Sequence, residues 1–257
     1  MMKMEEVFSH TFKALHHALG HDVTSSRQPV WQQRLSADSD FCRACVANGY
    51  LTEAQMQQAV SRYRLGRSRD GGVIFWQIDR LGQVYDGKIM YYRPDCHRDH
   101  DRHPQWAGNL LKRQFLRQFP DMAPWMPDSE HCLFGTHLLG EERRDEGEPL
   151  PCAVVEAEKT AVILSQHFPQ YLWLAAGGLN ELTPAKLFPL RRHRIILFPD
   201  TDEQCRAYTL WYRIAQEASR MLDQTVTVSP LLELRATPDQ KQRKIDLVDF
   251  LFESPPK

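Results

Sequence analysis

The chain has 257 residues, of which 42% are hydrophobic and 10% aromatic, so a folded interior is expected and wholesale disorder is excluded. Its 32 basic and 33 acidic residues nearly cancel, so a nucleic-acid partner has to be sought in local patches rather than in net charge. No apolar run approaches the ~18 residues of a membrane span, and the mean hydropathy is −0.51. The six cysteines are scattered and the amino terminus lacks a secretory signal, so we expect a cytoplasmic protein with no membrane contact.

The first two regions of the chain differ in their apolar spacing. Residues 1–63 show helical periodicity, and Thr52 followed by Gln55 predicts a capping box at the start of the last of these helices. Residues 64–150 read as an α+β subdomain. The features expected in it are a strand at 73–78, a partner strand at 88–92, a basic helix around 110–119 and a solvated acidic run at 140–151.

The third region, residues 151–257, alternates short apolar strands with helices. Strands are predicted at 153–155, 172–175, 194–198 and 225–228, and a final helix at Thr237. Continuous apolar strands separated by helices predict a parallel sheet that is covered on both faces. The fold class is therefore α/β, with a helical region and an α+β subdomain in front of the parallel sheet.

Carboxylates follow two of the predicted parallel strands. Glu156 comes directly after the first strand, and Asp200 and Asp202 come after the third. Ligands of open parallel sheets bind outside the carboxyl ends of the strands, so these acids would converge if the two strands are neighbours. Gathered carboxylates repel one another unless a cation lies between them, and hard oxygen ligands suit Mg²⁺ or Mn²⁺. The alternative is that each acid sits in solvent or caps the next helix.

These residues resemble a known family. The segments 154–160, Gly177-Gly178 and 196–202 are similar to a Toprim domain, the metal-binding fold of bacterial primases, topoisomerases and some nucleases. The segment 245–251 is similar to the acidic motif that follows the Toprim sheet in primases. Segments 66–70, 73–82 and 133–135 resemble the basic subdomain of the primase catalytic core. The likeness extends to uncharacterised primase-like proteins of bacterial mobile elements.

The resemblance implies a set of site residues and partners. Glu156, Asp200 and Asp202 would be catalytic and hold Mg²⁺ or Mn²⁺, with Asp246 and Asp249 as outer or second-metal ligands. The implied partners are single-stranded DNA or RNA and nucleotides, with a helicase or a replication or mobilisation protein as a further one. The implied activity is primase-like nucleotidyl transfer in DNA replication or mobile-element transfer.

Basic and glycine residues complete the predicted site. The candidate nucleic-acid contacts, which could equally form a solvated face, are Arg67, Arg69, Lys88, Lys112 and Arg113. Trp106 and Tyr92 are available for base stacking. Lys159 and the Gly177-Gly178 pair could approach phosphate. Alternatively, the lysine points into water and the glycines form a tight turn.

Several features depart from the primase pattern. Ala157 and Thr160 stand where many primases have Gly and Asp, and Cys205 lies near a position that usually carries Gly. No zinc ribbon for template recognition is evident. A Toprim nuclease would use the same acids, and a nucleic-acid-binding accessory protein with a degenerate site is the alternative from a different class.

A structural zinc site is a separate hypothesis. Cys42 and Cys45 form a C-x-x-C pair, and Cys96 lies in a polar loop with three histidines. The segment around Cys42 also reads as a helix with small buried thiols, and the sequence leaves both interpretations open.

Overall fold

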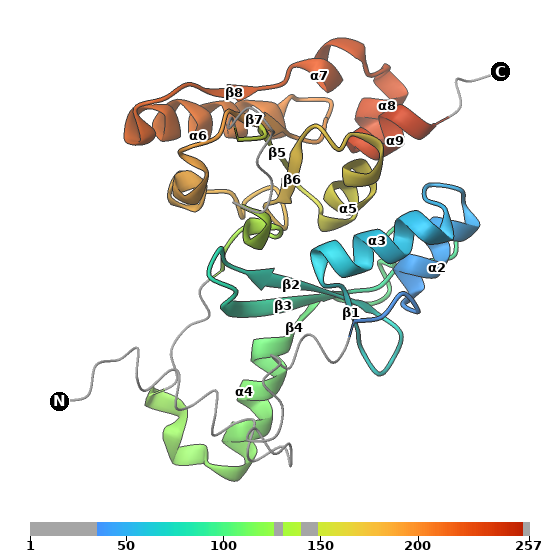
Figure 1. Cartoon of the computed structure of the whole chain (residues 1–257), viewed down its shortest axis with the longest axis vertical. Helices are drawn as coiled ribbons and strands as arrows, with labels where there is room; N and C mark the ends of the chain where they lie inside the picture. The colour runs from blue at the N-terminus through green and yellow to red at the C-terminus, as the bar shows by residue number, and fades with distance from the viewer. Residues whose placement is uncertain (1–34, 126–130, 140–148, 254–257) are drawn as a thin grey trace.

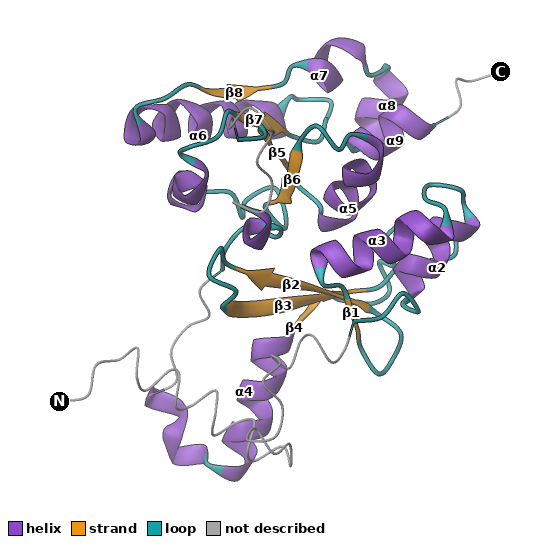
Figure 2. Cartoon of the chain, in the orientation of Figure 1, coloured by secondary structure: helices purple, strands orange, loops and turns teal. Residues whose placement is uncertain are grey.

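The structure is a computed structural model that describes residues 35–125, 131–139 and 149–253. Two four-stranded sheets organise these residues, one antiparallel and one parallel (Figures 1 and 2). The first of the predicted amino-terminal helices and most of the acidic run at 140–151 lie outside the described residues. Within the described ranges, no helix has both the length and the apolar character needed to cross a membrane.

The antiparallel sheet has the order β1-β2-β3-β4. Its strands are β1 (Gly66–Arg67), β2 (Val73–Ile78), β3 (Val84–Met90) and β4 (Gln105–Trp106). The predicted strand at 73–78 is confirmed, but its partner begins at Val84 rather than at residue 88. The reason is a short turn in which the Asp79 carboxylate accepts the N–H groups of Leu81 and Gln83, at 2.8 and 2.9 Å, so that pairing resumes soon after Ile78.

Helices α2 (Asp40–Ala47) and α3 (Glu53–Tyr63) precede this sheet. The capping box predicted at Thr52 and Gln55 is present, with the Gln55 N–H 3.2 Å from the Thr52 hydroxyl. Helix α2 packs against β2, and α3 packs against α5 (Glu158–His167) of the third region. The amino-terminal helices therefore connect the two halves of the molecule.

Helix α4 (Ala107–Gln118) follows β4 and extends away from both sheets (Figure 1). None of its residues is buried. Its first turn is fixed by the buried carboxylate of Asp86, which accepts the N–H of Gly108 at 2.8 Å. Two 3₁₀ segments follow, η2 (Pro120–Trp125) and η3 (Thr136–Leu138).

The parallel sheet has the order β6-β5-β7-β8, and every neighbouring pair is parallel, as predicted. Its strands are β5 (Cys152–Val155), β6 (Leu172–Ala175), β7 (Ile195–Phe198) and β8 (Val226–Val228). The helical segments that connect and follow them are α5, η4 (Ala185–Leu190), α6 (Arg206–Leu222), α7 (Leu231–Arg235), α8 (Pro238–Arg243) and α9 (Leu247–Phe252). β5 and β6 are buried along their whole length because elements cover both faces.

The carboxyl-terminal helix predicted from Thr237 is interrupted. Its capping box is present, but the helix ends at Arg243 because Lys244 adopts a left-handed conformation with φ of 57°. Asp246 then caps a second helix, α9. This break places Asp246 and Asp249 at a helix start rather than in a helix interior.

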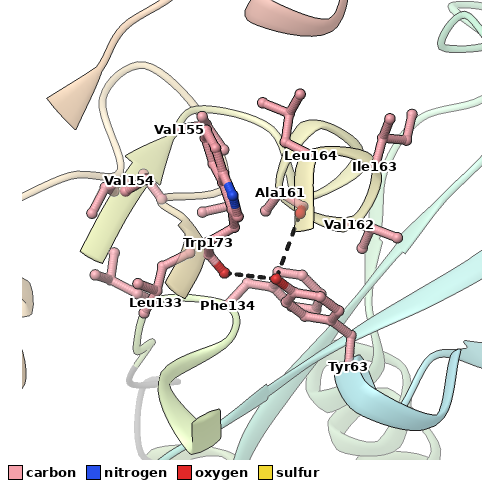
Figure 3. Close-up of a cluster of buried hydrophobic side chains, with 14 of the residues drawn as sticks. Tyr63, Leu133, Phe134, Val154, Val155, Ala161, Val162, Ile163, Leu164 and Trp173 are labelled. Carbon is pink, nitrogen blue, oxygen red and sulfur yellow. Dashed lines mark hydrogen bonds between the residues drawn. The ribbon is translucent and has the colours of Figure 1, made fainter. Parts of the chain in front are cut away.

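A shared core joins the two sheets (Figure 3). The buried Tyr63 ring stacks on Phe134, with 5.1 Å between ring centroids, and its hydroxyl donates to the Trp173 carbonyl at 2.9 Å. Phe134 pairs in turn with Ala175 at the end of β6. Residues of α3 and of the segment before η3 therefore pack directly on the parallel sheet. The division of the chain at 63/64 and 150/151 stays a prediction.

Candidate functional site

Two of the predicted acids meet at the carboxyl ends of neighbouring strands. β5 and β7 are adjacent and paired through Val155 and Phe198, so the residues that follow them emerge at the same edge of the sheet. The side chain of Glu156 accepts the backbone N–H of Asp200 at 3.2 Å. The structure therefore brings Glu156 and Asp200 together, as their positions after the strands predicted.

Asp202 turns toward the start of helix α6. Its two carboxylate oxygens accept the N–H groups of Gln204 and Ala207, each at 2.9 Å. Burial opposes ionisation of Asp202, but these backbone donors, with that of Arg206, outweigh it and hold the pKa of the carboxyl below its ordinary value. This is the capping role that the sequence left open for Asp202. Cys205 sits in the same turn with φ of 53°, a conformation that favours glycine.

Neither Glu156 nor Asp200 forms an ion pair with a basic side chain in the part of the chain that the structure describes. Burial raises the pKa of Glu156 to about 7, and the charges of Asp202 and Asp246 add to this against the opposing Asp200 N–H. Burial likewise raises the pKa of Asp200 well above its ordinary value; the charges of Glu156 and Asp246 add to this, and the charge of Lys159 opposes it. Within the described residues, no Lys, Arg or His lies within ion-pair distance of either carboxylate. The pair is thus unfavourable as two anions and suited to a bound cation.

Asp246 and Asp249, unlike Glu156 and Asp200, lie beside a basic side chain, that of Lys159. The Lys159 ammonium lies 3.2 Å from Asp246 and 3.7 Å from Asp249, and the Thr160 hydroxyl donates to Asp246 at 2.7 Å. Burial opposes charge on Asp246, but Lys159 together with the hydrogen bonds from the Asp249 N–H and the Thr160 hydroxyl outweighs it and lowers the pKa of that carboxyl. Burial and the Asp246 charge raise the pKa of Asp249. The structure therefore places Lys159 against two carboxylates rather than toward an open phosphate site, and Thr160 supports one of them.

Lys88 lies at the junction of the two sheets. Its ammonium is 3.1 Å from the carboxylate of Glu158 and donates to the Gly177 carbonyl at 2.6 Å. Gly177 has φ of 95°, and its own N–H donates to the Glu156 carbonyl at 2.9 Å. Lys88 is buried, so it is not exposed beside Arg67 as a nucleic-acid contact would be. Instead it connects β3 to the glycine turn beside Glu156.

Asp86 and His131 were missed by the sequence analysis. Asp86 lies two residues before Lys88 on β3, so both side chains point to the same face of the sheet. Its carboxylate is 3.5 Å from the His131 ring, which stacks on Trp106 with 4.1 Å between centroids. Strand alternation from Lys88 could have indicated Asp86, whereas no local pattern indicates His131.

The remaining basic candidates lie on separate edges of the antiparallel sheet. Arg67 and Arg69 are exposed at the β1 edge, where Arg67 donates to the Asp38 carbonyl at 2.8 Å. The half-buried Lys112 and the exposed Arg113 are on α4, which follows the opposite edge strand, β4. The sheet order thus separates the two pairs.

The thiol candidates and Tyr92 are buried. The Sγ atoms of Cys45 and Cys96 are 3.6 Å apart, while Cys42 points toward the Ser36 carbonyl. Tyr92 packs against Phe41 in the core, with 5.0 Å between rings, and is not available for base stacking. Across the described part of the chain, no group of three or more His, Cys, Asp or Glu side chains is arranged to hold a metal ion.

The fold and these acids define a mixed α/β protein with an unpaired carboxylate site at the end of a parallel sheet. The chain belongs to the family described as "Domain of unknown function (DUF6371)", whose model matches residues 41–201. The match includes the antiparallel sheet, Glu156 and Asp200, and it ends one residue before Asp202. None of the curated proteins matches the chain.

Two solved structures are similar to this one at low sequence identity. The primase fragment of the bacteriophage T7 primase-helicase protein is 16% identical, with a TM-score of 0.41, over 81% of this chain and 71% of that one. The RNA polymerase domain of the Mycobacterium tuberculosis primase DnaG is 14% identical, also with a TM-score of 0.41, over 86% and 81%. Similarity at this level does not carry function, which has to be argued from the side chains.

Proposed function

We propose that the protein transfers phosphoryl groups on nucleic acid with the help of Mg²⁺ or Mn²⁺, as a Toprim-type enzyme whose reaction is primase-like nucleotidyl transfer. The observation that carries this is the Glu156–Asp200 pair, which lies at neighbouring strand ends with no Lys, Arg or His of the described residues within ion-pair distance. Two adjacent carboxylates with raised pKa values destabilise the fold when both are ionised, unless a cation is bound between them. The reaction would belong to DNA replication or mobile-element transfer, with a helicase or mobilisation protein as a partner.

The residues present fit a hard divalent cation. Mg²⁺ commonly uses one or two carboxylates and completes its coordination with waters and substrate phosphates, so a gathering of three protein ligands is not required. Glu156 and Asp200 would hold the ion, with Asp202 and Asp246 close enough to influence their charge. When bound, such an ion neutralises phosphate oxygens and activates the attacking oxygen.

Other side chains would position rather than coordinate. Lys88 fixes the turn at Gly177 by donating a hydrogen bond to the Gly177 carbonyl. The Gly177 N–H donates to the Glu156 carbonyl and so holds the backbone of Glu156. Lys159 holds Asp246 and Asp249 close together and lowers the pKa of Asp246, so both would serve as outer carboxylates. Arg67 and Arg69 offer exposed charge for a nucleic-acid backbone at the β1 edge.

The test measures Mn²⁺ binding by calorimetry in the parent and in the Asp200→Asn, Asp202→Asn double variant. We expect heat of binding in the parent and its loss in the double variant. Asp223→Asn is the matched control, since this aspartate is exposed at the far end of α6 and asparagine tolerates its φ of 51°. Equal heats in all three proteins would overturn the metal site and with it the proposed enzyme.

A second assay separates the alternatives. With a single-stranded template, nucleotides and Mn²⁺, primer extension products indicate nucleotidyl transfer, whereas shortening of the labelled strand indicates a Toprim nuclease. Strand binding with neither reaction would favour the accessory protein. The accessory reading is supported by Ala157 and Thr160, which replace residues of the primase pattern.

A further inference from the structure

One face of helix α6 carries arginines at a regular spacing. Arg206, Arg213 and Arg220 are seven residues apart, and seven residues drift by only ~20° around a helix, so their side chains form one stripe. All three are exposed, and within the described residues none lies within ion-pair distance of a carboxylate. Glu217 lies on the same face, four residues after Arg213 and three before Arg220, and is not within ion-pair distance of either in the described residues. The stripe therefore spans about 21 Å and carries a net positive charge.

Two tyrosines lie on the flank of α6 between this stripe and the buried face of the helix. Tyr208 and Tyr212 are one turn apart, with ring centroids 6.1 Å apart and ring planes inclined by 20°. Tyr212 is 47% exposed. Large aromatic rings held in a near-parallel pair at the surface offer flat faces for further stacking.

A groove runs between α6 and the edge strand β8. Its volume is about 590 Å³, with Ala215, Val226 and Val228 on its apolar side and Tyr212 and Arg220 among its other lining residues. β8 ends the parallel sheet, so its outer edge has no neighbouring strand in the described residues (Figure 1). An apolar hollow beside an aromatic ring and an arginine suits a flat ring that carries a nearby negative charge.

The stripe starts at the acidic site. Arg206 occupies the first turn of α6, and the next residue, Ala207, donates its N–H to Asp202. The arginines then lead from Asp202 along α6 to the groove at Arg220. A chain of phosphates bound at the carboxylate site could continue onto this helix without a break.

We propose that the α6 stripe, meaning Arg206, Arg213 and Arg220 with Tyr208, Tyr212 and the groove beside β8, binds single-stranded nucleic acid. The arginines contact phosphates, and Tyr212 and the groove receive bases. This inference rests on the proposed function for its choice of polyanion. It places the strand on a helix of the parallel-sheet half, away from the basic residues of the antiparallel sheet.

A single strand explains the surface better than an acidic protein does. Regularly spaced arginines match a regularly charged backbone, and stacked aromatic rings bind bases of any sequence. An acidic protein would satisfy the arginines but would leave the tyrosine pair and the apolar groove without a role. Competition by polyglutamate separates the two partners.

The experiment measures binding of fluorescein-labelled oligo(dT) to the full chain by anisotropy, in EDTA and at several salt concentrations. Each phosphate contact on a single strand contributes ~0.7 to the slope of log affinity against log salt, so the Arg213→Gln, Arg220→Gln double variant should lower that slope by about 1.4. Arg235→Gln is the control, since Arg235 is exposed on α7 away from the stripe. It should leave the slope at the parent value.

The tyrosine is tested against a strand of the same length that lacks bases. The parent should prefer the base-bearing strand, and Tyr212→Ala should weaken that preference by roughly 5- to 150-fold. The proposal is overturned if the parent does not bind the strand or if the arginine variant keeps the parent's salt slope. It is also overturned if polyglutamate displaces oligo(dT) while Tyr212→Ala leaves the preference for the base-bearing strand unchanged. Because EDTA removes metal, failure of the carboxylate site does not alter these results.

Discussion

Glu156→Gln should make the metal-free protein more stable at neutral pH. Glutamine keeps an oxygen that can accept the Asp200 N–H, which lies 3.2 Å from the glutamate, and removes only the charge. The Glu156 carboxyl is buried and its pKa is raised from the ordinary 4.5 to about 7, chiefly by burial. Replacing this buried carboxyl by an amide removes the free-energy cost of ionising it in the folded protein.

The sign and size follow from proton linkage. The unfolded chain releases this proton near pH 4.5 and the folded chain near pH 7, so rising pH destabilises the parent through this window. One pKa unit corresponds to ~1.36 kcal/mol, so the full shift is worth roughly 3 kcal/mol above pH 7. Removing the Glu156 charge also eases the ionisation of Asp200, which acts in the same direction.

The assay is urea unfolding of parent and variant in EDTA at pH 5 and pH 8. The two proteins should have similar midpoints at pH 5, and the variant midpoint should be higher by about 1 M at pH 8. The control is Glu203→Gln, which removes an exposed glutamate from the loop between β7 and α6. Its urea midpoint should equal that of the parent at both pH values. Saturating Mn²⁺ should stabilise the parent and not Glu156→Gln. If the variant is no more stable than the parent at pH 8, the inference that ionised Glu156 destabilises the metal-free fold is wrong.

Two further variants test the buried ion pairs. Lys159→Met leaves Asp246 without its cation and should lower the free energy of unfolding by roughly 3–5 kcal/mol in urea titrations, with partial recovery when Asp246→Asn is added; equal losses in single and double variants would contradict the pairing. Lys88→Met should cost a similar roughly 3–5 kcal/mol because it strands the buried Glu158 carboxylate, and Glu158→Gln should restore part of it in a double-mutant cycle. A coupling energy near zero between Lys88 and Glu158 would show that the junction does not depend on this pair.

Local signals in the sequence determined much of the secondary structure. The capping boxes at Thr52 and Thr237 and the strands at 73–78 and 172–175 were predicted and found, because each depends on residues within a few positions of one another. The order of apolar strands and helices also predicted a parallel sheet. The sequence therefore indicated that Glu156 and Asp200 end up at one edge.

Only the tertiary structure decided what each charge does. Lys88 on β3 and Glu158 at the start of α5 are 70 positions apart, and no local pattern indicates that they pair. Because the helix breaks at Lys244, Asp246 caps the next helix and lies beside Lys159. Asp202 accepts a backbone N–H at the start of α6 and therefore does not join Glu156 and Asp200. Periodicity reports which side of an element is apolar, whereas the partner of a buried charge depends on how separate elements pack. For this protein that packing left the neighbouring Glu156 and Asp200 carboxylates without a basic side chain of the described residues within ion-pair distance.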